Sequence, residues 1–327
     1  MVWRHEVKRS LPARIANRVA AMAGVQNQNN KKIQRWIDES DVVISNTITN
    51  GDFLHAFDFS KVRLVLSYVH ELEIATGFYT NTNDINFVKK ITNRYLVPSK
   101  AVATHLINNL AIAGDTILQL NYYVPFTGNA GPAVTKTGAT FVVGLIGTLD
   151  WRKGADILTV MVAYFFKKHP EADLLFVWKG VDKNSIECKR INYELKKLNL
   201  GAKLRFETAS KEVDDFYQAI DILLLISKED PYPLVVLEAA SYYKPCICFE
   251  RAGGAPEFVS NDAGDIVPYL DIEGITDAIY SYYTDRSKSV TKGIQAQARY
   301  LYLHYNKDLV ASQFNAAVQP DARKQPV

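Results

Sequence analysis

The sequence has few of the features that mark disulfide-stapled, membrane-spanning or nucleic-acid-binding proteins. Its 327 residues include only three cysteines, Cys188, Cys246 and Cys248. Such a small and odd number of cysteines, with no pairing pattern, predicts that the protein resides in a reducing compartment. The sequence contains no apolar run of about 18 residues, which argues against a spanning helix. Lysine and arginine number 38 against 35 acidic residues, and this net charge of +3 argues against a nucleic-acid partner.

Three ligand-binding signatures are also absent from the sequence. It has no Gly-x-x-x-x-Gly-Lys-Ser/Thr phosphate loop, no Gly-x-Gly-x-x-Gly fingerprint and no Asp-x-Asp motif. The first absence excludes a P-loop NTPase, and the second counts against a nicotinamide-dependent oxidoreductase. The third absence, with no paired set of cysteines and histidines, predicts a protein that needs neither a metal nor a cofactor.

The first 23 residues are basic and amphipathic but lack the apolar centre of a signal peptide. The favoured interpretation is a surface helix of a cytoplasmic protein. A helix that lies on an anionic membrane surface is the alternative, and it would give the protein a peripheral membrane contact.

From about residue 140, predicted strands and helices alternate with little interruption. Such alternation predicts a doubly wound α/β domain with a parallel sheet covered on both faces. The predicted strands are Phe141–Leu149, Asp173–Trp178, Leu204–Glu207, Asp221–Ser227, Pro245–Phe249 and Asp265–Pro268, and the predicted helices are Lys153–His169, Ser185–Leu198, Val213–Ala219, Leu234–Tyr243, Ala255–Val259 and Ile272–Tyr283.

The first part of the chain is also α/β, but with only three or four predicted strands. Thr127–Gly138 has the composition of an interdomain linker. Residues 291–327 read as closing helices followed by a tail. The elements predicted in the first part are the strands Val42–Ser45, Leu64–Tyr68 and Arg94–Pro98 and the helices Gln26–Glu39 and Ser99–Leu110.

Candidate binding residues follow the predicted strands, where open α/β sheets bind ligands. Arg152 and Lys153 stand at a predicted helix start after Gly147 and Thr148. Cations at a helix N-terminus are repelled by the positive end of the helix dipole. Their presence there therefore suggests that an anion such as a diphosphate binds at this point. Two solvated surface charges are the ordinary alternative.

Two further loops carry groups suited to a nucleotide. Asp230 and Glu238 are separated by seven residues, and a carboxylate near a helix start can accept two hydrogen bonds from a ribose diol. Gly253 and Gly254 open another predicted helix, where their amides could meet an anion. Each pattern has an ordinary explanation as well, namely a helix-favouring acid and a glycine turn.

The order of these motifs resembles the retaining GT-B glycosyltransferases of family 4. The motifs are Gly-Thr-Leu-x4-Gly from Gly147, Glu-Asp-x-Tyr-Pro-Leu-Val-Val-Leu-Glu-Ala-Ala from Glu229, and Gly-Gly-Ala-Pro-Glu-Phe-Val from Gly253. The resemblance covers roughly residues 140 to 285. It implies two Rossmann-like domains: residues 1–130 form a partial acceptor-side domain, and residues 138–290 bind the nucleotide sugar.

The resemblance also implies roles for individual residues. Glu238 would hold the ribose, Asp230 would face the donor sugar, and Arg152 and Lys153 would bind the diphosphate. His70 follows a predicted strand where the family often has a histidine near the donor sugar, although a structural histidine is the alternative. The further donor contacts would be Gly147, Thr148, Leu234, Gly253 and Gly254.

The implied reaction moves a sugar from a nucleotide-diphosphate donor to a hydroxyl of a glycan or lipid-linked acceptor, with retention of configuration, in polysaccharide or glycan assembly. One departure from the family concerns the first domain, because no strand with a glycine-containing loop is recognisable before Asp41. A truncated first domain is therefore expected. A non-catalytic nucleotide-sugar-binding subunit, or a fragment of a larger transferase, is the alternative function.

Overall fold

The computed structural model of the chain describes residues 25–125 and 139–319. Two compact units divide the chain: one takes in the residues up to Tyr68 together with Thr76–Tyr95, and the other takes in Val69–Ala75 and the residues from Leu96 onward. The predicted N-terminal surface helix and the predicted linker lie outside the described residues. The expected lack of an opening strand stays a prediction for the same reason.

The first sheet has four strands in the order β1-β2-β3-β4. The predicted strands β1 and β2 are confirmed residue for residue, and they pair in parallel. The prediction missed three short helices and one strand. In chain order the elements are α2 (Val25–Asp38), β1 (Val42–Ser45), α3 (Gly51–Leu54), β2 (Leu64–Tyr68), α4 (Glu73–Tyr79), α5 (Thr82–Ile91), β3 (Arg94–Val97), α6 (Lys100–Asn108) and β4 (Ile117–Gln119).

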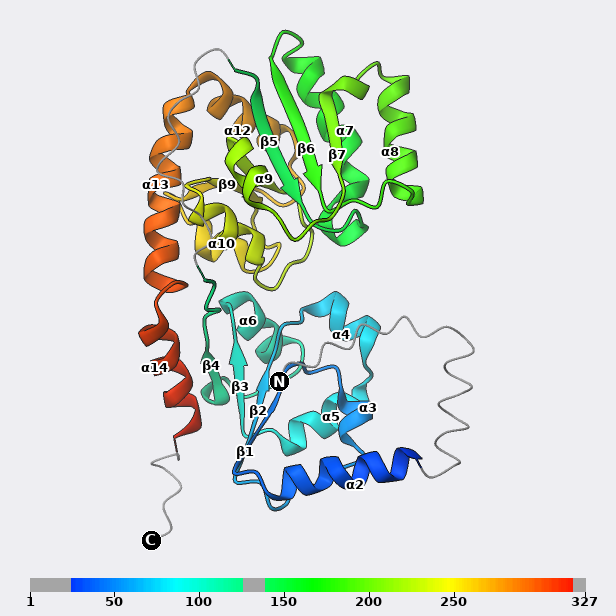
Figure 1. Ribbon diagram of the computed structural model, residues 1–327, viewed down its shortest axis with the longest axis vertical. Helices are drawn as coiled ribbons and strands as arrows, with labels where there is room; N and C mark the ends of the chain where they lie inside the picture. Colours follow the sequence, from blue (N-terminus) through cyan, green and yellow to red (C-terminus); the bar gives the residue numbers. More distant parts are fainter. Residues whose placement is uncertain (1–24, 126–138, 320–327) are drawn as a thin grey trace. The chain divides into compact units, whose positions relative to one another are not determined.

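The second sheet has six strands in the order β10-β9-β8-β5-β6-β7, with parallel pairing (Figure 1). This is a doubly wound order. From β5 the strands are added towards one edge of the sheet, as β6 and β7, and then towards the other edge, as β8, β9 and β10, so that the order reverses between β5 and β8. Its elements are β5 (Phe141–Ile146), α7 (Ala155–Lys168), β6 (Leu174–Lys179), α8 (Ile186–Lys197), β7 (Leu204–Glu207), α9 (Asp214–Ala219), β8 (Ile222–Leu225), α10 (Leu234–Ser241), β9 (Cys246–Phe249), α11 (Ala255–Val259), β10 (Gly264–Val267) and α12 (Ile272–Thr284).

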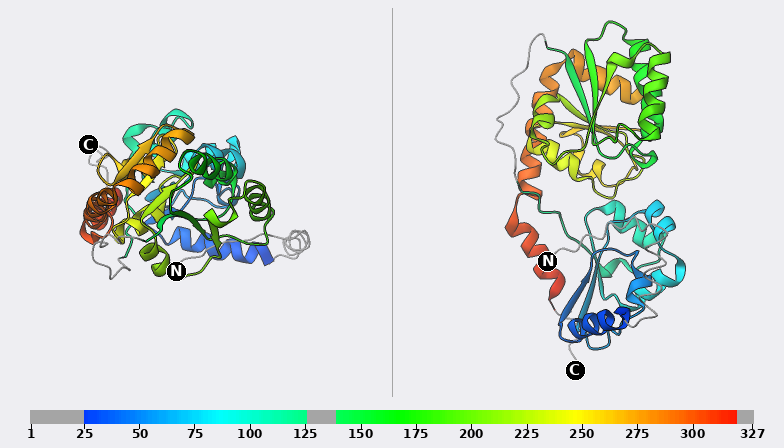
Figure 2. Two further views of the ribbon diagram at one scale, coloured as in Figure 1. Left: turned by 90° about the horizontal axis from the view of Figure 1, so that it is seen from above. Right: turned by 45° about the vertical axis from the view of Figure 1, so that its right-hand side comes forward.

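Side chains on the two faces of this sheet enter two separate cores, because neighbouring strand residues point to opposite faces. Ile222 and Leu224 of β8 pack with α7, α8 and α12. Leu223 and Leu225 pack with α9, α10 and α11 on the other face. Figure 2 shows helices on both sides of the strands. Burial on both faces explains why these strands read as continuous apolar runs in the sequence.

The C-terminal helices α13 (Arg286–Leu303) and α14 (Lys307–Val318) confirm the predicted closing helices. The guanidinium of Arg299 in α13 donates to the carbonyl oxygens of Phe258 and Val259 at the end of α11. Among the described residues, no helix is both long enough and apolar enough to cross a membrane.

The aromatic core under α7 generates a stability prediction. Phe165 is fully buried and its ring meets that of Phe176 edge to face at 5.9 Å. Phe165→Ala should lower the free energy of unfolding by about 3–5 kcal/mol, since it removes buried area and leaves a cavity. Val160→Ala in the same helix is the matched control, because Val160 is 60% exposed. Urea denaturation measures both, and equal effects would contradict this description of the core.

Candidate functional site

The loops that follow β5 and β8 meet at the reversal point of the second sheet, and we refer to this meeting point as the crevice. Open α/β sheets bind ligands at this place, outside the carboxyl ends of the strands. Backbone and side-chain hydrogen bonds join the two loops. The Lys228 amide donates to the Arg152 carbonyl oxygen at 2.8 Å, and the Arg152 guanidinium donates to the Glu229 carbonyl oxygen at 3.1 Å.

The structure brings Arg152, Lys153 and Asp230 together at this crevice. The Lys153 ammonium forms an ion pair and a hydrogen bond with Asp230 Oδ2, and Arg152 Nη1 lies 3.9 Å from the same oxygen. The side chains of Lys153 and Asp230 are only 14% and 11% exposed, whereas Arg152 is 38% exposed. The ordinary alternative of two solvated surface charges is therefore wrong for Lys153, which is largely buried against Asp230.

The loop after β5 reaches Asp230 through a short turn. Asp150 caps this turn by accepting a hydrogen bond from the Lys153 amide at 3.0 Å, and the Thr148 hydroxyl donates to Asp150 at 2.6 Å. Gly154 follows with φ +84°, and a Cβ there would lie 2.2 Å from the Ile226 carbonyl oxygen. Helix α7 therefore begins at Ala155 and not at Lys153 as predicted. Thr148 orders the loop, and the predicted contact of Thr148 and Gly147 with a donor stays a prediction.

The glycine pair after β9 allows that loop to pass close to Asp230. The Asp230 amide donates to the Ala252 carbonyl oxygen at 2.7 Å, and the Gly254 amide donates to the Asp230 carbonyl oxygen at 3.1 Å. A Cβ on Gly253, whose φ is +122°, would lie 1.8 Å from that carbonyl oxygen. The Gly254 amide has a backbone acceptor in this structure, and the expected donor contact of Gly253 and Gly254 stays a prediction.

Glu238 lies on α10, as predicted, and is the fifth residue of that helix. Its carboxylate accepts a hydrogen bond from the hydroxyl of Tyr217 at 2.6 Å. Leu234 is the first residue of α10 and is 45% exposed. Tyr217 was not predicted from the sequence, because nothing in the spacing of α9 and α10 pairs these two residues.

His70 belongs to the same compact unit as Asp230. Its Nδ1 shares a 2.7 Å hydrogen bond with the hydroxyl of Tyr122, and the two rings stack. Burial lowers the pKa of His70 to about 4, and burial, ahead of the charge of Asp230, raises the pKa of Tyr122. At neutral pH, His70 is thus an uncharged imidazole held by a phenol.

A second buried histidine, His304, ties the C-terminal helices to Tyr122. His304 Nδ1 lies 2.9 Å from the carbonyl oxygen of Tyr122, and Nε2 lies 3.0 Å from the hydroxyl of Tyr232. Because a carbonyl only accepts, Nδ1 carries the proton and the Tyr232 hydroxyl donates to Nε2. Burial lowers the pKa of His304 to about 4.

Three more carboxylate or hydroxyl groups form contacts around the loop of Asp230. The sequence did not predict these contacts. Glu229 accepts from the Ile74 amide at 3.1 Å, and burial raises the pKa of Glu229. Ser99 caps α6 by accepting from the Val102 amide, and its hydroxyl donates to the Pro231 carbonyl oxygen at 2.8 Å. Glu257, at the glycine pair, accepts from two amides at the start of α6.

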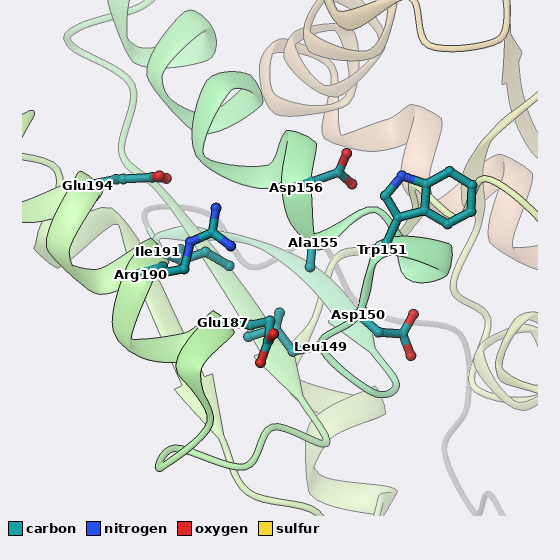
Figure 3. Close-up of a pocket in the computed structure, with 9 residues that line it drawn as sticks. All are labelled: Leu149, Asp150, Trp151, Ala155, Asp156, Glu187, Arg190, Ile191 and Glu194. Atoms are coloured by element: carbon teal, nitrogen blue, oxygen red, sulfur yellow. The ribbon is translucent and has the colours of Figure 1, made fainter.

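A cavity of about 510 Å³ lies at the N-terminal ends of α7 and α8 (Figure 3). It borders the loop of Lys153 but does not include Lys153, Asp230 or Glu238. Four carboxylates and one guanidinium contribute to its lining. The lining residues are Leu149, Asp150, Trp151, Ala155, Asp156, Glu187, Arg190, Ile191 and Glu194.

Comparison with solved structures identifies the class of fold. The chain resembles HepE of Anabaena, solved in complex with UDP and glucose, with a TM-score of 0.75 and 18% identity over 91% of this chain and 83% of HepE. Identity at this level supports the fold alone. The α/β, GT-B-like fold predicted from the sequence is confirmed, with a parallel sheet in each half.

Residues 132–299 match the family model of the glycosyl transferases group 1, and the chain belongs to that family. The amylovoran biosynthesis glycosyltransferase AmsD of Erwinia amylovora is 24% identical over 151 residues, which cover 43% of this chain and 42% of AmsD. The D-inositol 3-phosphate glycosyltransferase of Corynebacterium jeikeium is 28% identical over 159 residues, covering 47% of this chain and 38% of that enzyme. The chain thus matches less than half the length of these two relatives.

The unequal burial of the two cations generates a prediction. Lys153→Ala should lower the free energy of unfolding by on the order of 3 kcal/mol, because it leaves the carboxylate of Asp230 largely buried without its closest cation. Arg152→Ala should cost less than about 1 kcal/mol, since that side chain is more exposed. Urea denaturation of both variants measures the difference. Equal costs would mean that Lys153 and Asp230 do not form the main pair.

The partly buried His70 and the buried His304 predict how stability depends on pH. The pKa values of His70 and His304 are about 4 in the folded chain, below the ordinary value of 6.5. Between these values the unfolded chain binds protons that the folded chain does not, so the free energy of unfolding should fall as the pH drops from 6.5 towards 4. His304→Gln should make this slope shallower in urea denaturation. An unchanged slope in the folded His304→Gln variant would contradict the prediction.

Proposed function

We propose that this chain is a retaining glycosyltransferase that moves a sugar from a nucleoside-diphosphate sugar to a hydroxyl of a glycan or lipid-linked acceptor. The observation that carries the proposal is the cluster of Arg152, Lys153 and Asp230 at the reversal point of the second sheet. A cation pair beside a carboxylate suits a ligand with a diphosphate at one end and sugar hydroxyls at the other. Membership of the glycosyl transferases group 1 supports the same function.

In the proposed reaction, negative charge develops on the leaving diphosphate. Arg152 and Lys153 stabilise that charge, and their fixed positions mean that little reorganisation is needed as it forms. Lys153 exchanges Asp230 for a phosphate oxygen when the donor binds. Asp230 then accepts hydrogen bonds from hydroxyls of the sugar. No metal is needed for this charge stabilisation, so the proposed transfer is metal-independent.

Two further residues complete the proposed donor site. The carboxylate of Glu238 accepts hydrogen bonds from the ribose diol. His70, whose ring Tyr122 orients, lies at the sugar end and stays uncharged at neutral pH because burial lowers its pKa. Crystal structures of the similar protein HepE contain UDP or UDP-glucose. UDP is therefore the first nucleotide to test.

The competing proposal is a non-catalytic subunit that binds a nucleotide sugar without transferring it. Such a subunit would make the same predicted contacts with the nucleotide sugar. It is the competing proposal because the chain matches only 42% and 38% of the length of the two transferases named above. Turnover separates the two proposals. Release of sugar from UDP-glucose or another nucleotide sugar, with NMR showing the anomer first formed, would favour a retaining enzyme if the configuration of the donor is kept.

Nucleotide binding tests the ribose contact. UDP, GDP and ADP are titrated calorimetrically in the presence of EDTA, and at least one should bind. Glu238→Gln should weaken that binding roughly 10- to 100-fold, because a neutral amide replaces a charged acceptor. Glu194→Gln, on the exposed face of α8, is the control. Unchanged affinity in a folded Glu238→Gln variant, or binding that requires an added metal, would contradict the proposal.

A further inference from the structure

The carboxylate of Glu238 is held by a tyrosine from a different helix. Tyr217 lies on α9, is fully buried, and its hydroxyl lies 2.6 Å from Glu238 Oε2. Burial, followed by the charge of Glu238, raises the pKa of Tyr217 well above its ordinary value. The phenol therefore keeps its proton and acts as the donor. A carboxylate has about four acceptor positions, so Glu238 retains capacity for other hydroxyls.

The ring of Tyr217 is itself fixed in the core. It stacks on the ring of Tyr242 with centroids 5.4 Å apart and planes inclined by 19°. The Tyr242 hydroxyl donates to Asp214 at 2.6 Å, in the first turn of the helix that carries Tyr217. Tyr217 thus has one available orientation. A glutamate side chain has three rotatable bonds, and a partly exposed one would sample many conformations without such an anchor.

We propose that Tyr217 is a positioning residue for ribose recognition, which orients the Glu238 carboxylate so that its remaining lone pairs meet the ribose diol of the donor. This inference rests on the proposed function, because that function places the ribose at Glu238. It adds a residue from α9, a helix that carries none of the sequence motifs. The benefit of preorganisation is that binding loses less side-chain freedom.

The test compares ligands with and without the ribose hydroxyls. The probes are the nucleoside diphosphate that binds in the titration above, UDP, GDP or ADP, and its 2′,3′-dideoxy counterpart. Tyr217→Phe keeps the ring and removes only the hydroxyl. It should weaken binding of the ribonucleotide about tenfold and leave binding of the dideoxy nucleotide unchanged. This non-additivity identifies a contact that acts through the ribose.

Tyr242→Phe is the matched control, because it removes a buried phenol of the same stack that donates to Asp214 and not to Glu238. It should change the affinities for both nucleotides by the same factor. If Tyr217→Phe also weakens both nucleotides equally, or weakens neither, the inference is wrong while the proposed function stands. If the wild-type protein binds both nucleotides equally well, the ribose contact of the proposed function is wrong.

Discussion

The ion pair between Lys153 and Asp230 is the contact on which the arrangement of the site depends. Two largely buried charges are tolerated only as a pair with good geometry, because each alone would lose its hydration without compensation. The loops after β5 and β8 must therefore approach closely and in one register. Gly154 and Gly253 permit this approach, since a Cβ at either position would overlap a backbone oxygen of the β8 strand end or its loop. The charged pair and the glycines thus form one constraint.

The same pair explains how two cations can lie side by side at the proposed donor site. Arg152 and Lys153 would repel each other if no anion lay near them, and the carboxylate of Asp230 offsets that repulsion by pairing with Lys153. Under the proposed function, a diphosphate displaces the carboxylate and frees it for sugar hydroxyls. Donor binding would then exchange one ion pair for another instead of creating a new charge in a low-dielectric crevice.

The sequence predicted the second sheet well because both of its faces are buried, and buried parallel strands produce long apolar runs that alternate with amphipathic helices. Arg152, Lys153 and Asp230 were candidates because each follows a predicted strand, and they lie together because the carboxyl ends of parallel strands meet at one edge of the sheet. The sequence failed where residues distant in sequence pair through their side chains, as Tyr217 does with Glu238. It missed α5, although Asn81 accepts hydrogen bonds from two amides as its cap, because the helix is short and largely polar.

Tyrosine hydroxyls hold the ionisable groups around the site. Tyr122 contacts His70, Tyr232 contacts His304, and Tyr217 contacts Glu238. Burial raises the pKa of all three tyrosines, so they stay protonated throughout the physiological range. Burial also keeps both imidazoles uncharged down to about pH 4. These tyrosines and histidines therefore contribute orientation without a change of charge. Under the proposed function, Arg152, Lys153 and the carboxylates are then the charged groups that determine which ligands bind.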